Sequence, residues 1–320
     1  MSNNIDVLLV GTGYMGKEYN KVLKSQGVSY CVVGRSEENC EKFEKETETK
    51  AIRGGIEEYL KIASVLPEYA IVAVSGINLA SVTLLLLNAG VKNILVEKPG
   101  ATYLNEIKMV CDAAEKMKAK VYVGYNRRFY ASTEKALEII KMDKGVTSFH
   151  FEFTEWGHRI RTLNKPKEIL DTWLYANSSH VCDLAFFLGG FPREMSCYSG
   201  GEVDWHESGS IYTGAGVSEK GALFSYCANW AAPGRWSVEV MTSQHRLYFK
   251  PLEKLSIQDL GSVKVDELEI DDRLDRLYKP GLYKEVECFL NQTNTDQKVT
   301  IQDQYEHFKL YQKIECGSFE

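Results

Sequence analysis

A short apolar strand that runs into a glycine-rich turn and then a helix constrains this chain more than any other feature. Residues 7–10 are Val-Leu-Leu-Val, the turn is Gly11, Thr12, Gly13, Tyr14, Met15 and Gly16, and a helical pattern covers 14–25. In such a turn the first glycine permits the tight bend, the second lets the backbone approach a pyrophosphate, and the third allows close helix packing. The N-terminus of the helix complements an anion. This order of elements predicts a dinucleotide-binding site.

Strands and helices continue to alternate after this turn. Continuous apolar runs are typical of strands buried on both faces, and their alternation with helices specifies a doubly wound parallel sheet. We expect strands at 29–33, 69–74, 94–96 and 120–124, a short strand at 51–52, and helices at 37–47, 56–62, 79–89 and 105–118. The first domain is therefore predicted to be α/β and to span residues 1–124.

The pattern changes after residue 124. A helix is expected at 132–142, and residues 147–156 then alternate apolar and polar side chains, which is typical of a sheet with one buried face. Further strands are expected at 193–200, 209–217, 222–230, 236–241 and 246–249, an insertion at 157–189, and helices at 283–290 and 302–314. Residues 125–320 are thus predicted to form an α+β domain on an open, mostly antiparallel sheet. A chain of 320 residues suits two domains.

The residues that follow the second strand bear on the choice between NAD and NADP. An NAD site usually places an acid there for the ribose hydroxyls, but this chain has Gly34, Arg35 and Ser36. The glycine makes room, and the other two side chains can donate hydrogen bonds to a 2′-phosphate, which predicts NADP as cofactor with NAD as the alternative. Arg35 as a solvated residue at a helix start remains the other interpretation. Ser75, Gly76 and Asn78 follow the next strand at the same ligand-binding edge.

A lysine stands at the end of the strand at 94–96. Glu97, Lys98 and Pro99 follow it, where a ligand binds in sheets of this kind. We therefore expect Glu97 and Lys98 to contact the cofactor. A surface lysine that simply ends the strand is the alternative.

Composition excludes several classes of function. The formal net charge is −6, without a basic stripe, so binding to nucleic acid or to an anionic membrane is not expected. The N-terminus lacks the pattern of a signal peptide and the longest apolar run is too short to span a membrane, which favours a cytoplasmic protein. The eight cysteines are scattered without a Cys-x-x-Cys pair, so neither a metal site nor a disulfide framework is expected.

Four motifs in order give the chain a resemblance to a known family. The motifs are Gly11 to Gly16, Glu97-Lys98-Pro99, the run from Gly124 to Phe129 and the run from His180 to Leu184. Together they resemble the Gfo/Idh/MocA oxidoreductases. The resemblance implies an N-terminal Rossmann domain, a C-terminal α+β domain whose open sheet often forms an oligomer interface, and oxidation or reduction of a sugar, polyol or inositol carbon with NAD or NADP. It also makes Lys98 the counterpart of the family's active-site lysine and raises the prospect of a cis peptide before Pro99.

The resemblance extends to a helix that faces the nicotinamide, with one departure. This helix commonly carries Asp-x-x-x-His and a second Asp three residues later. His180 and Asp183 match the last two, but the first position is Ala176. A carboxylate that would support proton transfer is therefore missing, and Asn177, Ser178 or a residue of the insertion are candidates to replace it.

Hydride transfer at a secondary alcohol needs a group that exchanges the hydroxyl proton and a group that stabilises alkoxide character. His180 suits the first role because it titrates near neutral pH. Lys98 suits the second, with Asp183 orienting His180 or holding a substrate hydroxyl. Alternatively, Lys98 is itself the acid/base, and the sequence leaves this choice open.

Substrate contacts are expected from residues of both domains. For Trp156, Trp173 and Tyr175, core packing and stacking on a sugar are equally compatible with the sequence. Arg127 and Arg128 are interpreted first as structural bridges near the domain junction, with direct ligand binding as the alternative. His158, Arg159 and Arg161 form a small basic group that could hold a substrate carboxylate or phosphate, or simply a solvated loop. The expected substrate-binding residues are Lys98, Tyr125, Arg127, Trp156, Trp173, Asn177 and His180.

These features predict an NAD(P)-dependent oxidoreductase, with NADP preferred, acting on a carbon of a sugar, sugar derivative or polyol. A reductase of an imine or another carbonyl is an alternative, and so is a non-catalytic protein that senses a dinucleotide on the same fold. The expected assembly is a homo-oligomer, a dimer or tetramer, formed through the C-terminal sheet.

Overall fold

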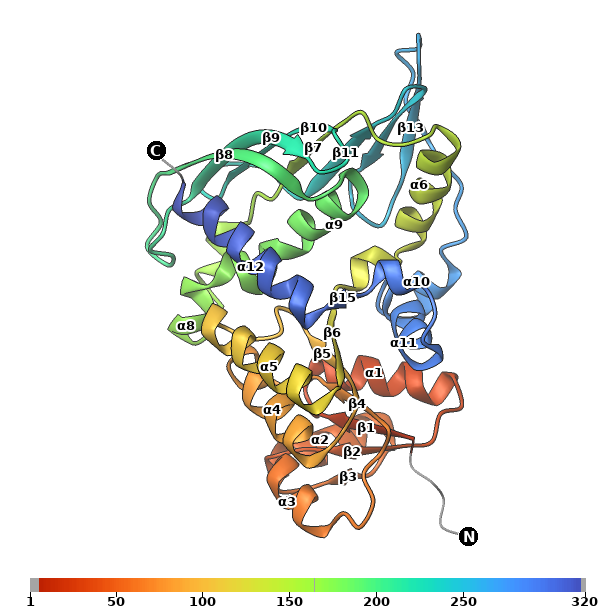
Figure 1. Ribbon diagram of the computed structural model, residues 1–320, viewed down its shortest axis with the longest axis vertical. Coiled ribbons are helices and arrows are strands. Elements are labelled where there is room, and N and C mark those ends of the chain that lie inside the picture. Colours follow the sequence, from red (N-terminus) through yellow and green to blue (C-terminus); the bar gives the residue numbers. More distant parts are fainter. Residues whose placement is uncertain (1–5, 164, 318–320) are drawn as a thin grey trace. The chain divides into compact units, whose positions relative to one another are not determined.

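The computed structural model describes residues 6–163 and 165–317, and these form two compact units (Figure 1). The first unit contains the described residues up to Asn126 together with Arg276–Glu306. The second contains Arg127–Asp275 and the described residues from His307 onward. The chain therefore passes between the units three times.

The first unit is built on a seven-stranded sheet with strand order β15-β6-β5-β4-β1-β2-β3. All pairs are parallel except β15 with β6, which is antiparallel. The strands are largely apolar, as expected for a sheet whose two faces are covered by helices, and every residue of β1 is buried. The strands are β1 Val7–Val10, β2 Tyr30–Val33, β3 Ala51–Ile52, β4 Tyr69–Val72, β5 Asn93–Glu97, β6 Lys120–Gly124 and β15 Val299–Thr300.

Two sets of helices flank this sheet. Because β2–β3 and β4–β6 lie on opposite sides of β1, right-handed crossovers place α1 and α2 on one face and α3, α4 and α5 on the other. Helix α11 joins the face of α1 and α2, where Phe289 packs edge-on against Tyr69 and Tyr122. The helices are α1 Tyr14–Ser25, α2 Glu37–Thr47, α3 Gly55–Ile62, α4 Leu79–Ala89, α5 Leu104–Met117 and α11 Leu282–Asn291, with 3₁₀ turns at Gly76–Asn78, Asn126–Phe129 and Thr295–Gln297.

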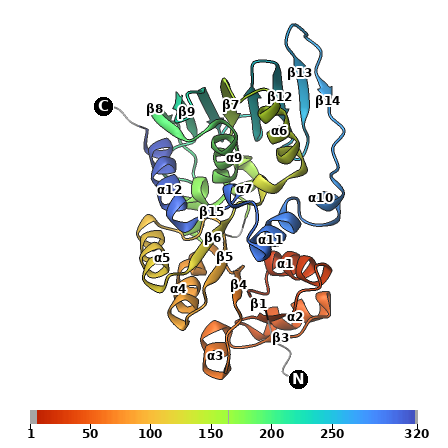
Figure 2. The ribbon, with the colours of Figure 1, turned by 45° about the vertical axis from the view of Figure 1, so that its right-hand side comes forward.

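The second unit is built on an eight-stranded sheet with strand order β14-β13-β12-β11-β7-β10-β9-β8 (Figure 2). Only β7 and β10 pair in parallel among these described strands. The strands are β7 Ser148–Glu152, β8 Pro192–Gly200, β9 Ile211–Ser218, β10 Leu223–Asn229, β11 Ser237–Met241, β12 His245–Phe249, β13 Ser256–Asp259 and β14 Asp266–Glu267.

One face of this sheet packs against helix α9, and the other is open. Phe149 and Phe151 of β7 point to the α9 side and contact Phe186 edge-on, whereas Leu223 and Ile211 are exposed on the opposite face. The helices are α6 Ala131–Met142, α7 Gly157–Ile160, α8 Lys167–Asp171, a π-helical turn at Leu174–Ser178, α9 Ser179–Gly189, α10 Arg273–Leu277 and α12 Ile301–Cys316, which begins in the first unit and ends in the second.

The predicted fold class is confirmed, with corrections to single elements. The strand expected at 147–156 ends at Glu152, so the following residues leave the sheet. The insertion at 157–189 is helical, and β13, β14 and β15 were not predicted because two of them are only two residues long. Strand β15 gives the otherwise parallel sheet an antiparallel edge.

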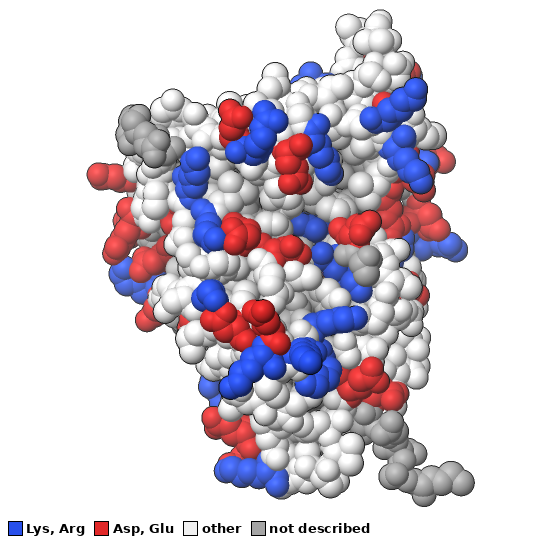
Figure 3. All heavy atoms as spheres, in the orientation of Figure 1, with Lys and Arg blue, Asp and Glu red and all other residues white. Residues whose placement is uncertain are grey.

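Acidic and basic side chains are interspersed over the described residues visible in Figure 3. Among the helices of the described chain, none combines the length and apolar character that crossing a membrane requires.

Candidate active site

The first unit contains a groove of about 640 Å³ at the carboxyl ends of β1, β2 and β4. This volume lies within the range of about 300–1,000 Å³ that small-molecule sites occupy. The groove unites nine of the predicted cofactor residues, namely Gly11, Thr12, Gly13, Tyr14, Met15, Arg35, Ser36, Ser75 and Asn78. Gly16, Gly34, Gly76, Glu97 and Lys98 are not among its lining residues.

The glycine turn forms one wall of this groove. Gly11 has a φ of +125°, and a Cβ there would collide with the carbonyl oxygen of Ala73. A Cβ on Gly16 would collide with the carbonyl oxygen of Gly11, whereas one on Gly13 would meet no atom within 4 Å. No side chain of the described residues caps the first turn of α1. The turn therefore leaves open space and helix N–H groups on the side where an anion would approach.

The role predicted for Gly34 needs correction. A Cβ at Gly34 would collide with Cys40 Sγ and lie 2.7 Å from Thr12 Cγ2. The glycine is therefore required by packing between the turn and α2, and it does not widen the groove for a phosphate. Ser36 is the N-cap of α2, where its Oγ accepts a hydrogen bond from the N–H of Asn39 at 3.3 Å.

Two charged side chains line the groove in addition to this cap. Arg35 follows β2, and Glu57 lies in the first turn of α3. The neighbouring Arg53 is held in ion pairs with Glu37 at 2.6 Å and Glu44 at 2.9 Å. Arg35 therefore contributes a guanidinium to the lining of the groove, and Glu57 contributes a carboxylate.

Lys98 lies at the end of β5, and the Lys98–Pro99 peptide is cis, as the resemblance suggested. The carbonyl oxygen of Pro99 accepts a hydrogen bond from Gln304 Nε2 at 3.0 Å. Next to Lys98, Glu97 accepts a hydrogen bond from the Tyr19 hydroxyl at 2.8 Å. Burial raises the pKa of Glu97, and the nearby Lys98 opposes that rise.

A second buried carboxylate lies near Glu97. Glu285 of α11 is 4% exposed, and neither carboxylate oxygen has a hydrogen-bond partner among the described residues. Burial, followed by the charge of Glu97, raises the pKa of Glu285 well above its usual range, and Lys279 opposes this only in part. Burial therefore favours the neutral, protonated form of Glu285 more than water does.

In the second unit, α9 carries His180 and Asp183 on one face, as predicted from their spacing. Asp183 is fully buried, and its two oxygens accept hydrogen bonds from Arg128 at 2.7 and 2.8 Å. Burial raises the pKa of Asp183, and the guanidinium opposes the rise. His307 stacks on Phe191 near this pair, with a pKa lowered well below its usual range by burial and by Arg128. Asp183 is thus committed to a bidentate pair.

The start of α9 is tied to a carboxylate that sequence reasoning missed. Glu155 is 2% exposed, and its Oε1 accepts hydrogen bonds from Asn177 Nδ2 and Ser178 Oγ, both at 2.8 Å. Its Oε2 accepts one from Arg235 at 3.3 Å. Burial raises the pKa of Glu155, and these donors oppose that rise.

The sequence contained a signal for Glu155. Phe149, Phe151 and Phe153 alternate with polar residues and are all buried, and Glu155 continues the same parity. A carboxylate on the buried side of such a pattern needs partners, so it marks either a buried network or a ligand site.

Arg235 connects Glu155 to aromatic residues near His180. Its guanidinium lies 4.5 Å from the ring centre of Trp236, which is 6.4 Å from the ring centre of His180. Arg127 also lies over Trp236, at 5.0 Å. His180 is 6% exposed, so this neighbourhood is almost fully enclosed by protein.

The remaining predicted substrate residues have varied surroundings. Trp156 is 38% exposed, donates to the carbonyl oxygen of Gly234 at 3.1 Å, and has the guanidiniums of Arg159 and Arg235 within 5 Å of its ring centre. Trp173 is buried edge-on against Trp205 at 6.1 Å. Tyr125 is 1% exposed and lies in the first unit. The described residues contain no cluster of three or more side chains suited to a metal ion.

Comparisons with solved structures agree on the fold. Levoglucosan dehydrogenase, solved with NADH and levoglucosan, is 16% identical, with 98% of this chain and 96% of that chain covered and a TM-score of 0.76. UDP-N-acetylglucosamine 3-dehydrogenase from Acidithiobacillus ferrooxidans is 14% identical, with 97% and 96% covered and a TM-score of 0.74. An oxidoreductase from Agrobacterium radiobacter, in complex with NAD+, L-tartaric acid and magnesium, is 11% identical, with 97% and 95% covered and a TM-score of 0.77. At such identities the likeness establishes the fold alone.

The sequence comparisons are more specific for the first unit. No curated protein matches the chain. The sequence model of the family described as "Oxidoreductase family, NAD-binding Rossmann fold" matches residues 5–125, which include the glycine turn and Lys98. The chain therefore carries, over residues 5–125, the NAD-binding Rossmann domain of the Gfo/Idh/MocA oxidoreductases, the family that its motifs resemble.

Proposed function

We propose that this protein is an NAD(P)-dependent oxidoreductase that transfers a hydride between nicotinamide and a carbon of a sugar or sugar derivative. The observation that carries the proposal is the groove at the carboxyl ends of β1, β2 and β4, with its glycine turn and the uncapped start of α1. Its open space at Gly13 fits a pyrophosphate. Two of the similar folds are sugar-type dehydrogenases by name, which supports this substrate class.

When bound, the nicotinamide would accept or donate the hydride, and the chain's own residues would manage the proton. We assign proton exchange at the substrate oxygen to His180 and stabilisation of its negative charge to Lys98. In the reverse assignment, Lys98 exchanges the proton and His180 donates a hydrogen bond. The pH dependence of variants at these two positions distinguishes the assignments.

We assign Asp183 and Glu155 to positioning. The bidentate pair of Asp183 with Arg128 fixes α9, and therefore the backbone of His180. Glu155 holds Asn177 and Ser178, three and two residues before His180, and so supplies a carboxylate near the position where Ala176 lacks one. We expect Glu155→Gln to lower kcat by about 10–100-fold and to shift its pH profile, with dinucleotide affinity unchanged. An unchanged pH profile would leave Glu155 a purely structural role.

We propose NADP as the preferred cofactor, supported by Arg35 in the groove and by the absence of an acid directly after β2. Glu57 is the acid that could bind ribose hydroxyls if NAD is preferred. We also propose a homo-oligomer through the open face of the second unit's sheet, where Leu223 and Ile211 are exposed. Leu223→Glu should then reduce the mass measured by light scattering.

A dinucleotide-sensing role without catalysis is the second candidate, favoured by Ala176 and by the commitment of Asp183 to Arg128. The deciding experiment titrates the purified protein with NADPH and NADH by nicotinamide fluorescence, then follows loss of the reduced-cofactor absorbance with a panel of sugars and keto-sugars. We expect Lys98→Met to lower turnover at least about 100-fold and to retain dinucleotide binding. Lys92→Met, just before the same strand, is the matched control. Binding without turnover on any oxidised or reduced substrate would favour the sensor.

A further inference from the structure

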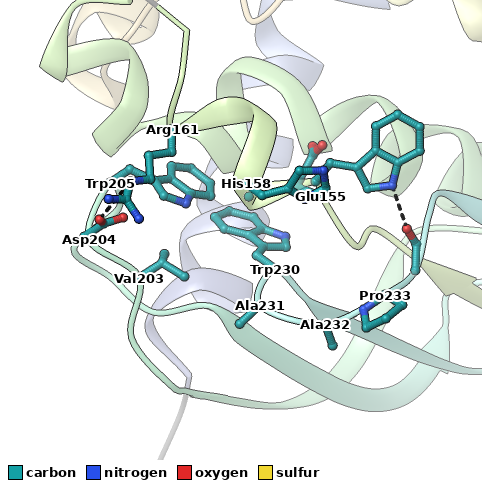
Figure 4. Close-up of a pocket in the computed structure, with 13 residues that line it drawn as sticks. Glu155, His158, Arg161, Val203, Asp204, Trp205, Trp230, Ala231, Ala232 and Pro233 are labelled. Atoms are coloured by element: carbon teal, nitrogen blue, oxygen red, sulfur yellow. Dashed lines mark hydrogen bonds and ion pairs between the residues drawn. The ribbon is translucent and has the colours of Figure 1, made fainter.

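The second unit contains a pocket of about 590 Å³ to which neither the glycine turn nor the predicted catalytic pair contributes (Figure 4). Its lining comes from three separate stretches, Glu155–Arg161, Val203–Trp205 and Trp230–Gly234. Figure 4 shows Arg161, Asp204 and Trp205 at one end and Pro233 at the other, with Trp230 between them. The pocket is of a size that suits a small organic ligand.

Two tryptophans form a firm wall of the pocket. Trp205 and Trp230 stack with ring centres 5.3 Å apart and an interplanar angle of 16°, and they are 8% and 2% exposed. The start of α7 packs tightly against this wall, since a Cβ on Gly157 would lie 2.5 Å from the carbonyl oxygen of Trp230. Because both rings are buried, the wall is preformed and does not need to rearrange around a ligand.

A few polar groups stand against this apolar wall. Glu155 is the buried one: its Oε1 accepts two hydrogen bonds, its Oε2 accepts one from Arg235 at 3.3 Å, and Trp173 also lies within reach of the carboxylate. Because a carboxylate has about four acceptor positions, Glu155 retains capacity for a ligand hydroxyl. His158 is an exposed residue of the same lining and lies beside Glu155 above Trp230 in Figure 4. An apolar wall with a small number of polar groups is the usual composition of a specific ligand pocket.

The charges of the pocket argue against an anionic ligand. Arg161 is the only permanently cationic lining side chain, all of the lining being within the described residues, and its guanidinium is paired with Asp204 at 3.2 Å. Glu155 and Asp204 add carboxylates to the same space. Among the lining residues, a phosphate or carboxylate would therefore meet two carboxylates and one guanidinium that is already paired, whereas a neutral hydroxyl-bearing ring can use both the indole wall and the carboxylate acceptor.

We infer that this pocket binds a neutral sugar ring of the substrate, so that the substrate class is a glycoside or oligosaccharide and not a sugar phosphate or nucleotide sugar. Glu155 Oε2 and His158 hydrogen-bond its hydroxyls, and Trp230 and Trp205 face its C–H groups. This inference rests on the proposed function for its link to a reaction, but binding to the pocket can be measured without turnover.

The five tryptophans of the chain all lie in the second unit, so tryptophan fluorescence, excited selectively over tyrosine, reports on that unit. The probes are methyl β-D-glucopyranoside, methyl α-D-galactopyranoside and cellobiose as neutral ligands, with glucose 6-phosphate as the anionic one. We expect saturable fluorescence changes with at least one neutral probe. His158→Ala should weaken that binding at least fivefold, and His150→Ala, which removes a histidine from β7 instead, should change it less than twofold.

The Asp204→Asn variant tests for a gain of binding. It removes the ion-pair partner of Arg161, so it should bind glucose 6-phosphate severalfold more tightly than the wild type does. The inference is overturned if no neutral probe binds, if His158→Ala binds like the wild type, or if glucose 6-phosphate binds the wild type more tightly than every neutral probe. NADPH binding is measured in parallel by nicotinamide fluorescence. If the wild type binds NADPH but no sugar, the inference about the pocket is refuted and the proposed function stands. If the wild type does not bind NADPH, the proposed function is refuted.

Discussion

The groove of the first unit and the pocket of the second are similar in volume but are built by opposite means. Main chain dominates the groove: a glycine turn, strand ends and the open start of a helix provide its shape and its anion-binding groups. Side chains dominate the second unit, where Glu155 and Asp183 are held by donors from distant segments. We therefore expect substitutions that add atoms to be the most damaging in the groove. In the second unit we expect the most damage from substitutions that remove one partner of a buried pair.

The largest effect expected from removing a charge is at Asp183→Asn in the second unit. The variant removes the carboxylate charge that pairs with the buried guanidinium of Arg128, which should cost about 3–5 kcal/mol of unfolding free energy. Urea unfolding followed by tryptophan fluorescence, which reports on this unit, is the measurement. A loss of unfolding free energy below about 1 kcal/mol would contradict the comparison, because the second unit would then tolerate removal of a buried partner.

In the first unit, Gly11→Ala should be the most damaging change. Its φ of +125° and the collision with Ala73 O combine to cost about 3 kcal/mol in backbone strain and overpacking. Gly13→Ala is the matched control, since its Cβ meets no atom within 4 Å. We expect it to retain the thermal midpoint and yet lose dinucleotide affinity, because the methyl group fills the groove. Equal midpoints for the two alanine variants would contradict the geometry.

Glu285 is an exception in the first unit, a buried carboxylate whose oxygens have no hydrogen-bond partner among the described residues, and its removal should stabilise the protein. Because its folded pKa is raised above the unfolded value of about 4.3, its favourable contribution is present at low pH and is lost as pH rises through the folded pKa. Glu285→Met should therefore gain about 1–3 kcal/mol at pH 8 and less at pH 5. Thermal melts across this range test it, with the exposed Glu287→Met as control. A gain that is independent of pH would mean that Glu285 does not titrate as described.

The smallest effect expected is on cofactor choice. Arg35→Ala should weaken NADPH binding about tenfold, or 1.4 kcal/mol, and NADH binding less than twofold. Lys50→Ala removes the same charge from a side chain that is 95% exposed, and should change neither affinity. If Arg35→Ala weakened NADPH and NADH binding to a similar extent, Arg35 would contact a part of the cofactor that both molecules share. Tighter NADH binding by the wild type would refute the NADP preference.

The sequence was most informative where local rules decide the structure. Helix α1 begins at Tyr14 within the glycine turn, directly after its N-cap Gly13, and α2 begins after its Ser36 cap. The predicted ranges of both helices match the structure. The buried strands of the first sheet were recognisable because both of their faces are covered. The groove follows from these elements, since strand ends and helix starts place its residues without long-range information.

The second unit was less predictable because its site depends on contacts between distant residues. Nothing in the sequence pairs Glu155 with Arg235, or Arg128 with Asp183, since such partners are chosen by tertiary packing. The role assigned to Gly34 was wrong for the same reason: the space beside it is taken by Cys40, which comes from the following helix. The sequence signal for the burial of Glu155 was its position in the alternating pattern, on the same side as three buried phenylalanines.

The return of Arg276–Glu306 to the first unit delays the completion of that unit during synthesis. After Asn126 is added, 180 further residues must be added to reach Glu306, the last residue of that unit, which takes roughly 10–40 s at about 5–20 residues per second. During this time the edge of β6 awaits β15, and Tyr69 and Tyr122 await Phe289 of α11. A ribosome that stalls in between therefore presents an unpaired strand edge beside apolar surface, the combination through which nascent chains associate with one another.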